Sequence, residues 1–199
     1  MHRTKVITLG PYRLLPLTDN VQSKHEKLVS GLLDLFSRDE VVRYNPSRRL
    51  KSRAAAELKI LDTLESYESG FCYDYYLFDL EDDKMIGFVS AISPDGVRAA
   101  YPILPSLPSL EKVNSNIWML EFYLHPDYWR NGIMGIFTGT LMNNLFEQGA
   151  SLVSALVDAN NIASQNTLLK LKFDKNPEYK DHQNQHLYTR DKPIGLQLQ

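Results

Sequence analysis

Two glycines, Gly132 and Gly135, lie where an apolar stretch gives way to a helical pattern, a place where a chain can bind an anion. Residues 118–124 are typical of a buried strand, and residues 125–132 form the turn that follows. A helix is then predicted by apolar residues at helical spacing, namely Ile133, Ile136, Phe137, Leu141 and Leu145. The first turn of a helix has unpaired backbone N–H groups, and glycines let a ligand approach them closely. We therefore expect a phosphate-binding loop, although a glycine pair before a helix is also compatible with a plain turn.

Upstream of this loop, the sequence predicts the elements that position it. In chain order these are a strand at 12–17, a helix that follows the capping residues Thr18, Asp19 and Asn20 and ends at Phe36, a second helix at 52–67, and a hairpin of strands at 71–80 and 84–92. Between the two helices, the run from Arg48 to Lys51 could attract an anionic substrate. Short charge runs usually face water, so we interpret this run as a solvated loop and assign it no site role.

The segment from residue 93 to residue 116 contains four prolines, Pro94, Pro102, Pro105 and Pro108. Proline interrupts a central strand, so we predict a long exposed loop here. Residues 101–104 could line an acceptor pocket or belong to a plain insertion, and both interpretations stay open. Further along, the pattern predicts a strand at 151–157, a turn at 158–161 that caps another helix, a last strand at 187–190 and a frayed tail at 192–199.

The composition is that of a soluble globular protein. Of 199 residues, 43% are hydrophobic and 23% are charged, which fits a single domain over residues 1–199. No apolar run reaches the roughly 20 residues of a membrane span, and the first five residues lead into no secretory signal, so we expect a cytoplasmic protein. The single cysteine, Cys72, excludes an internal disulfide, makes a cysteine metal cluster implausible and fits a packed strand position. The net charge of −2 gives no reason to expect nonspecific nucleic-acid binding.

Residues 129–134 resemble the acyl-CoA pyrophosphate loop of the GNAT superfamily of N-acetyltransferases. In that loop a Gln or Arg, two variable residues, a Gly, one residue, and a Gly or Ala open a helix. The preceding residues 125–129, His-Pro-Asp-Tyr-Trp, are similar to the Rim-type branch, which contains the ribosomal-protein N-terminal acetyltransferases and in which a Trp commonly takes the Gln or Arg place. Met134 departs from the second small residue of the family.

A second resemblance lies at residues 161–173, which are similar to the family's Asn, two residues, Ser, several residues and then Leu-x-Lys-Leu-Gly-Phe. Only the Gly is replaced, by Lys172. The two motifs occur in the expected order, so the resemblance covers residues 12–190, and its specific part is 118–173. It implies a single α/β (α+β) GNAT-like domain with a mixed, mostly antiparallel sheet, flanked by helices and split beside the fourth strand.

The resemblance also implies that acetyl-CoA binds as a co-substrate and that no metal takes part. It assigns cofactor binding to residues on the strand before the loop, in the loop and at the start of the later helix: Phe122, Tyr123, Leu124, Trp129, Arg130, Asn131, Gly132, Ile133, Met134, Gly135, Asn161 and Ser164. Seen alone, an Asn at the position of Asn161 is more often a helix cap than a ligand contact.

The chemistry that the resemblance implies is direct attack of a neutral amine on the thioester of acetyl-CoA, with no covalent enzyme intermediate. The protein must then accept the amine proton and supply a proton to the leaving thiolate. Glu121 interrupts an apolar strand and is the candidate base. It could also simply lie on the polar face of that strand. His125 or water could take its place as the base. Many relatives carry a Tyr at the place of Leu168, so Ser164 is the candidate donor to the thiolate.

Two other functions stay open. Met134, Leu168 and Lys172 favour a catalytically silent acyl-CoA-binding or regulatory module. A nucleotide phosphotransferase is disfavoured, because the loop lacks a Gly-Lys-Ser/Thr ending and no metal carboxylate cluster is evident. The acceptor remains open among protein N-termini, amino sugars, polyamines and amino-bearing antibiotics. We therefore expect an amine-bearing small molecule or a protein N-terminus as partner, with no nucleic acid and no membrane, and a monomer or homodimer.

Overall fold

The fold is built around one eight-stranded sheet, seen in a computed structural model that describes residues 4–17, 24–111, 116–179 and 184–193. Its strands are β1 (Ile7–Leu9), β2 (Tyr12–Pro16), β3 (Cys72–Asp79), β4 (Lys84–Ile92), β5 (Ile117–Leu124), β6 (Leu152–Asp158), β7 (Asp174–Lys175) and β8 (Gln185–Asp191). Their order across the sheet is β1-β2-β3-β4-β5-β6-β8-β7, and every neighbouring pair is antiparallel except β5 with β6. The predicted mixed, mostly antiparallel sheet is confirmed.

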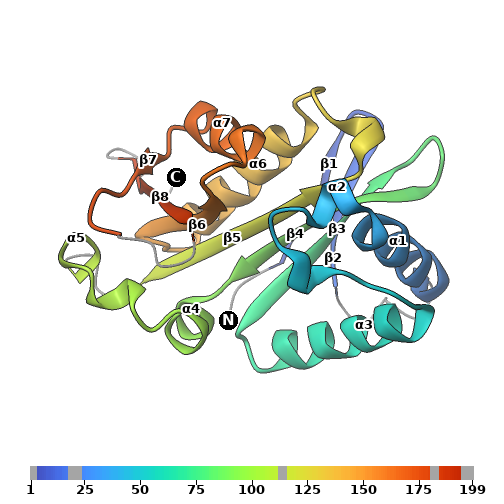
Figure 1. Cartoon of the computed structure of the whole chain (residues 1–199), viewed down its shortest axis with the longest axis horizontal. Coiled ribbons are helices and arrows are strands. Elements are labelled where there is room, and N and C mark those ends of the chain that lie inside the picture. The colour runs from blue at the N-terminus through green and yellow to red at the C-terminus, as the bar shows by residue number, and fades with distance from the viewer. Residues whose placement is uncertain (1–3, 18–23, 112–115, 180–183, 194–199) are drawn as a thin grey trace.

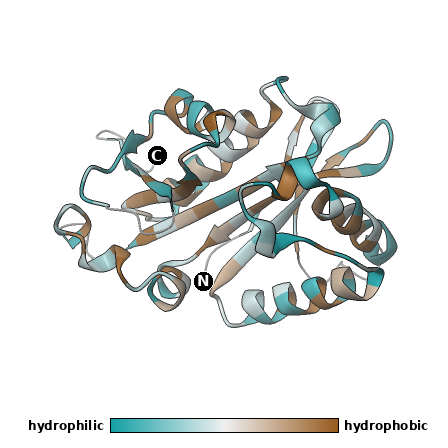
Figure 2. Ribbon diagram, in the orientation of Figure 1, coloured by the Kyte–Doolittle hydropathy of each residue, from teal (hydrophilic) through white to brown (hydrophobic). Residues whose placement is uncertain are grey.

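Helices cover both faces of this sheet. They are α1 (His25–Ser37), α2 (Asp39–Val42), η2 (Pro46–Arg48), α3 (Arg53–Glu68), α4 (Pro94–Ala100), η3 (Leu104–Ser106), α5 (Pro108–Glu111), η4 (Pro126–Tyr128), α6 (Ile133–Glu147) and α7 (Ile162–Lys170). The helices α1 and α3 pack on one face, and α6 and α7 pack on the other (Figure 1). Figure 2 shows apolar residues along the central strands and on the helices against them. No helix in the described part of the chain is long and apolar enough to cross a membrane.

Short-range signals account for most of these elements. The side chain of Ser52 caps α3 by accepting the backbone N–H of Ala55 at 3.2 Å, so the helix predicted at 52–67 is observed at 53–68. The predicted hairpin is β3 and β4, and the strand predicted at 187–190 lies within β8. The first helix ends at Ser37, one residue beyond the prediction. Its predicted caps at 18–20, and most of the tail, lie outside the described residues. The short strands β1 and β7 were not predicted.

The long exposed loop predicted after β4 is wrong for residues 93–111. These residues form α4, η3 and α5, whose side chains Val97, Leu104 and Leu110 are buried against β5, β6 and β8. The reason is that proline is favoured in the first turn of a helix, where its missing N–H has no partner to lose. Pro94 and Pro108 both begin helices, and the side chain of Ser93 caps α4. This segment therefore packs as part of the core.

The sheet opens between β5 and β6. These strands pair in parallel only over Ile117–Met119 and Leu152–Ser154, although β5 continues to Leu124 and β6 continues to Asp158. On their other sides both strands stay paired, β5 with β4 and β6 with β8. Beyond Met119 and Ser154, the facing edges of β5 and β6 therefore no longer pair with each other. The predicted split is confirmed, and β5 is the strand beside which it lies (Figure 1).

Candidate active site

Gly132 is the N-cap of α6, which follows β5 and its turn. Gly132 has φ 73° and ψ −2°, in the left-handed region that favours glycine, and it caps the helix without a side chain. A Cβ at this position would meet no atom within 4 Å, so the space in front of the helix start is open. The first backbone N–H groups of α6 therefore face an open space with the positive end of the helix dipole behind them.

Two aromatic residues hold the loop that leads to Gly132. The indole N–H of Trp129 donates to the carbonyl oxygen of Leu124 at 2.8 Å, and the hydroxyl of Tyr128 donates to Asp79 at 3.1 Å. The loop is thereby tied to the end of β5 and to the β3–β4 hairpin. Arg130 and Asn131 are exposed, and Arg130 has φ 67°. The backbone is thus held in place while the outer side chains remain accessible.

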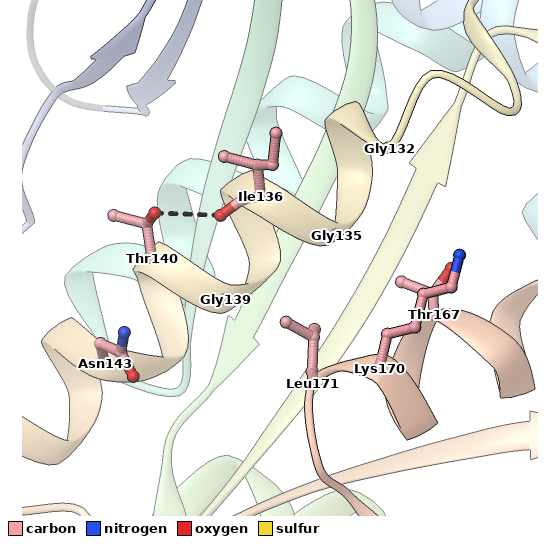
Figure 3. A pocket seen from close by; sticks show the side chains of 9 residues that line it. All are labelled: Gly132, Gly135, Ile136, Gly139, Thr140, Asn143, Thr167, Lys170 and Leu171. Carbon is pink, nitrogen blue, oxygen red and sulfur yellow. Dashed lines mark hydrogen bonds between the residues drawn. The ribbon is translucent and has the colours of Figure 1, made fainter.

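A groove of about 450 Å³ runs from this helix start between α6 and α7 (Figure 3). It is lined by Gly132, Gly135, Ile136, Gly139, Thr140 and Asn143 of α6 or its cap and by Thr167, Lys170 and Leu171 of α7 or its end. The helices approach closely here, because a Cβ at Gly139 would lie 2.8 Å from Leu171. Lys170 supplies the cation of the groove. The side chain of Met134 is buried in the core, so only its backbone can face a ligand.

On the other side of the opening, α7 begins after β6. The side chain of Asn161 caps the helix by accepting the backbone N–H of Ser164 at 3.2 Å. This is the N-cap role that is common for Asn at a helix start. The amide of Gln165 donates to the carbonyl oxygens of Asp158 and Ala159 at the end of β6. Ser164 is half-buried in the first turn of α7. Its position as a proton donor stays a prediction.

Glu121 lies at the centre of a hydrogen-bonded network, and its side chain is 20% exposed. Its Oε1 accepts from Asn45 at 3.2 Å, from the hydroxyl of Tyr123 at 2.5 Å and from Nε of Arg48 at 3.1 Å. Its Oε2 accepts from Nη2 of Arg48. Each carboxylate oxygen has two lone pairs. Oε1 accepts all three of the first bonds, and Oε2 accepts only one from the described part of the chain, so one acceptor position remains on Oε2.

The interpretation of the Arg48 run as a solvated loop is wrong for Arg48. This side chain reaches Glu121, which is 73 positions away in the sequence. Burial opposes the charge of the guanidinium, but Glu121 and Tyr123 outweigh it and raise the pKa of Arg48. Burial, and then Glu121, raise the pKa of Tyr123, which therefore keeps its proton and acts as a donor. No local pattern signals such a pair, because its partner lies on a distant strand.

Tyr101, at the end of α4, lies on the same side as this network. Burial and then the negative charge of Glu121 raise its pKa. The charge of Glu121 therefore acts on Tyr101, and a role of residues 101–104 in an acceptor pocket stays a prediction.

His125 is a structural residue in this arrangement. Its side chain is 1% exposed, and its Nδ1 accepts the backbone N–H of Asp127 at 3.3 Å. Its Nε2 lies 3.4 Å from the carboxylate of Asp34 on α1. Burial, followed by the cations Arg38 and Lys84, lowers the pKa of His125. Both ring nitrogens face protein groups, which argues against His125 as the alternative base.

A buried polar strip continues from Glu121 across the sheet. Ser90 of β4 lies opposite Glu121, and Asp74 of β3 lies opposite Ser90. The carboxylate of Asp74 is 3% exposed and accepts from Thr63 at 3.0 Å and from Cys72 at 3.2 Å. Cys72 is thus a packed strand residue, as predicted, and burial raises the pKa of its thiol. The strip and Glu121 therefore lie side by side on neighbouring strands.

Glu121 and Ser164 lie on opposite faces of the sheet. Glu121 shares its face with Tyr123, which packs against Phe36 of α1. Ser164 belongs to α7, which is held on the other face by the buried Leu168. The two candidates lie on either side of the sheet where β5 and β6 no longer pair.

A sequence comparison decides the family. The acetyltransferase (GNAT) domain profile matches residues 23–174, which cover more than half of the chain. The chain belongs to the GNAT family. It is accordingly an acetyl-CoA-dependent acetyltransferase. A comparison with curated protein sequences gives no match.

Solved structures share the GNAT fold over nearly their whole length. The ribosomal-protein-S5-alanine acetyltransferase from Vibrio fischeri matches with a TM-score of 0.71 and 16% identity, over 96% of this chain and 98% of that one. RimL, a ribosomal L7/L12 alpha-N-protein acetyltransferase in complex with coenzyme A, matches with a TM-score of 0.61 and 15% identity, over 94% and 98%. The Microcin C7 self immunity acetyltransferase MccE, in complex with acetyl-CoA and AMP, matches with a TM-score of 0.66 and 13% identity, over 92% and 93%.

The structure shows the surroundings of Lys172 and Leu168, the two positions in the second motif where this chain differs from many GNAT proteins. Lys172 has φ 64°, in the left-handed region, which explains why a glycine suits this position. Leu168 is fully buried in the core, so this position offers no polar group to a thiolate. In the described residues no group of three or more His, Cys, Asp or Glu side chains could hold a metal ion.

Proposed function

We propose that this GNAT protein transfers the acetyl group of acetyl-CoA to a primary amine by direct attack of the amine on the thioester. One observation carries the proposal: β5 and β6 part after Met119 and Ser154, beside the open start of α6. The unpaired edge of β5 offers backbone N–H and C=O groups to an extended ligand arm. The start of α6 offers N–H groups to a pyrophosphate. Coenzyme A has both of these parts in this order.

The rest of coenzyme A fits the adjoining surfaces. The pantetheine arm runs along Phe122, Tyr123 and Leu124 and ends near the gap between the strands. The nucleotide end lies toward the groove between α6 and α7, where Lys170 pairs with a phosphate. The match between the order of the chemical groups along the cofactor and the order of the surfaces along the protein supports these placements.

Proton transfer in this proposal uses one residue on each face. The amine nitrogen attacks the thioester carbon, and its proton passes to the remaining acceptor position on Oε2 of Glu121, directly or through water. The C–S bond breaks, and the thiolate takes a proton from Ser164 or from water. Tyr123 and Arg48 hold the Glu121 carboxylate in position. The fully buried Leu168 is the observation that favours the alternative, a catalytically silent acyl-CoA-binding module.

The acceptor in this proposal is a protein N-terminus or a small amine. Two of the three solved structures described above are ribosomal-protein acetyltransferases, which supports a protein N-terminus as one class to test. The opening on the Glu121 face is where the amine must approach.

Two measurements test the proposal. Thermal melts with acetyl-CoA at 100 times its dissociation constant should show a gain of about 2.7 kcal/mol in stability, whereas ATP with magnesium should give none. Thiol release from acetyl-CoA, measured against a panel of amines, should then increase with at least one amine. Stabilisation by acetyl-CoA without amine-dependent thiol release would support the silent acyl-CoA-binding module. Stabilisation only by ATP with magnesium would overturn both the acetyltransferase and the silent module.

A further inference from the structure

Only one edge of the Arg48 guanidinium, formed by Nε and Nη2, donates hydrogen bonds to Glu121. Its Nε and Nη2 donate to the two carboxylate oxygens, and within the described part of the chain Nη1 has no hydrogen-bond partner. A guanidinium carries five N–H donors in a planar fork. The second edge, formed by Nη1 and the remaining N–H of Nη2, is therefore unused, and the side chain is 34% exposed.

The segment that carries Arg48 is held against β5. Asn45, which precedes η2, donates to both Glu121 and the hydroxyl of Tyr123 at 3.2 and 3.1 Å. Ser47 donates to the side-chain oxygen of Asn45 at 2.6 Å. Arg48 is therefore fixed by its own two contacts and by those of its neighbours. Such a guanidinium is preorganised, and binding a second planar anion would cost it little conformational entropy.

Stability alone explains this ion pair poorly. Removing two charges from water costs about as much as their attraction returns, so a partly buried pair adds little net stability. An arginine guanidinium keeps its charge in proteins. The charges of Glu121 and Arg48 both act on the pKa of Tyr101, in opposite directions. A permanently charged, half-exposed and rigid group beside the candidate base is better explained by ligand binding.

We propose that the acceptor carries an anionic group, a carboxylate or a phosphate, close to its amine, and that the free edge of Arg48 binds this group. The inference rests on the proposed amine acetylation at Glu121. The free position on Oε2 of Glu121 adjoins Nη2 of Arg48, so the amine and the anion bind within the width of a guanidinium. An amino acid, or a peptide with an acidic residue at its N-terminus, has this arrangement. An amino sugar or a polyamine without an anion does not.

Matched acceptor pairs test the inference. Glycine is compared with glycinamide, a peptide beginning Asp-Ala with one beginning Asn-Ala, and phosphoethanolamine with ethanolamine. Thiol release gives kcat/KM, and calorimetry gives the affinity of each acceptor for the complex with coenzyme A. We expect the anionic member of at least one pair to be favoured about 10- to 100-fold, as a charge-assisted hydrogen-bonded pair provides. The pair that shows the preference identifies the source as a carboxylate or a phosphate.

Two arginine variants isolate the free edge. Arg48→Lys keeps a cation for Glu121 but has no second planar edge, so the preference for anionic acceptors should fall to within about 3-fold while neutral acceptors keep part of their rate. Arg49→Lys is the matched control, because Arg49 is also 34% exposed but pairs with Asp39 and donates to the carbonyl oxygen of Ser37. It should leave the preference unchanged.

The outcomes separate this inference from the proposed function. Equal kcat/KM and equal affinity for both members of every pair would overturn the inference, even with good turnover. A preference that survives Arg48→Lys would overturn it as well. If no amine is acetylated but anionic acceptors still bind preferentially through Arg48, the inference holds and the proposed transfer fails.

Discussion

Met119 of β5 and Ser154 of β6 form the last residue pair between these strands, and the strands part immediately after it. The hydroxyl of Ser154 donates to the carbonyl oxygen of Trp118 at 3.0 Å, which ties the strands together at the point where the gap begins. Glu121 lies two positions beyond Met119, on the strand edge that the gap exposes. In the proposed function, the position of this strand pair therefore sets where the cofactor arm and the amine meet.

Gly132→Val should weaken coenzyme A binding about 10-fold or more, because a side chain then occupies the open space before α6. The left-handed φ also costs the variant about 1–2 kcal/mol of stability. Gly10→Val is the matched control, since Gly10 has φ 58° and no neighbour within 4 Å at its own Cβ position. Calorimetric titration checks the affinity. Similar affinities in both variants would mean that the loop is only a turn.

Lys170→Gln should weaken coenzyme A binding by about 2- to 5-fold, the range of a solvent-exposed ion pair. The effect should shrink as salt is added, because exposed charges are screened. Lys175→Gln changes an exposed lysine on β7 and should have no effect. Titrations at low and high salt check this. A loss that does not depend on salt would show that Lys170 acts by packing rather than by charge.

Glu121→Gln should lower turnover by about 10²–10⁴-fold with little change in acetyl-CoA affinity. Tyr123→Phe removes one donor to the same carboxylate but keeps the base, so its loss should be smaller. Steady-state rates of the two variants distinguish them. Full activity in Glu121→Gln would show that Glu121 is not the base and that water accepts the amine proton.

Ser164→Ala should lower turnover less than Glu121→Gln does, because water can also protonate a thiolate. The loss should shrink with an acyl donor whose thiol is more acidic, since such a thiolate leaves without help. The hydroxyl is not needed for the cap, which uses the backbone N–H of this residue, so the thermal midpoint should stay within a few degrees. The same loss with both donors would contradict a role at the sulfur.

The stability of the fold should fall as the pH drops below about 6.5, and His125 should account for part of this. Burial, then Arg38 and Lys84, lower its pKa in the folded state from the ordinary value of 6.5. The unfolded chain therefore binds a proton more readily, and the stability contributed by neutral His125 is present above pH 6.5 and is lost toward the lower folded-state pKa. Urea unfolding at pH 7.5 and pH 5.5 should show a smaller pH difference in His125→Gln. His25→Gln, at a 42% exposed side chain, should keep the wild-type difference.

Short-range features were predictable from the sequence. The helix over 133–147, the cap at Asn161 and the β3–β4 hairpin depend on contacts between residues a few positions apart, and periodicity and capping rules describe such contacts. The loop at 129–134 could be located for the same reason. Even the error at residues 93–111 is local, since Pro94 and Pro108 can either break a strand or begin a helix. The nearby apolar residues Val97, Leu104 and Leu110 pack into the core, and the positions of the prolines alone do not predict this packing.

The sequence by itself determined the family motifs, the order of the elements and the position of the glycine loop before α6, because each depends on a short run of residues. The tertiary structure decided that Arg48 holds Glu121, that His125 faces Asp34 and that β5 and β6 part after Met119. These contacts join segments that are far apart in the chain. They depend on strand register and on which helix covers which face, and those are set only when all the apolar surfaces are buried together.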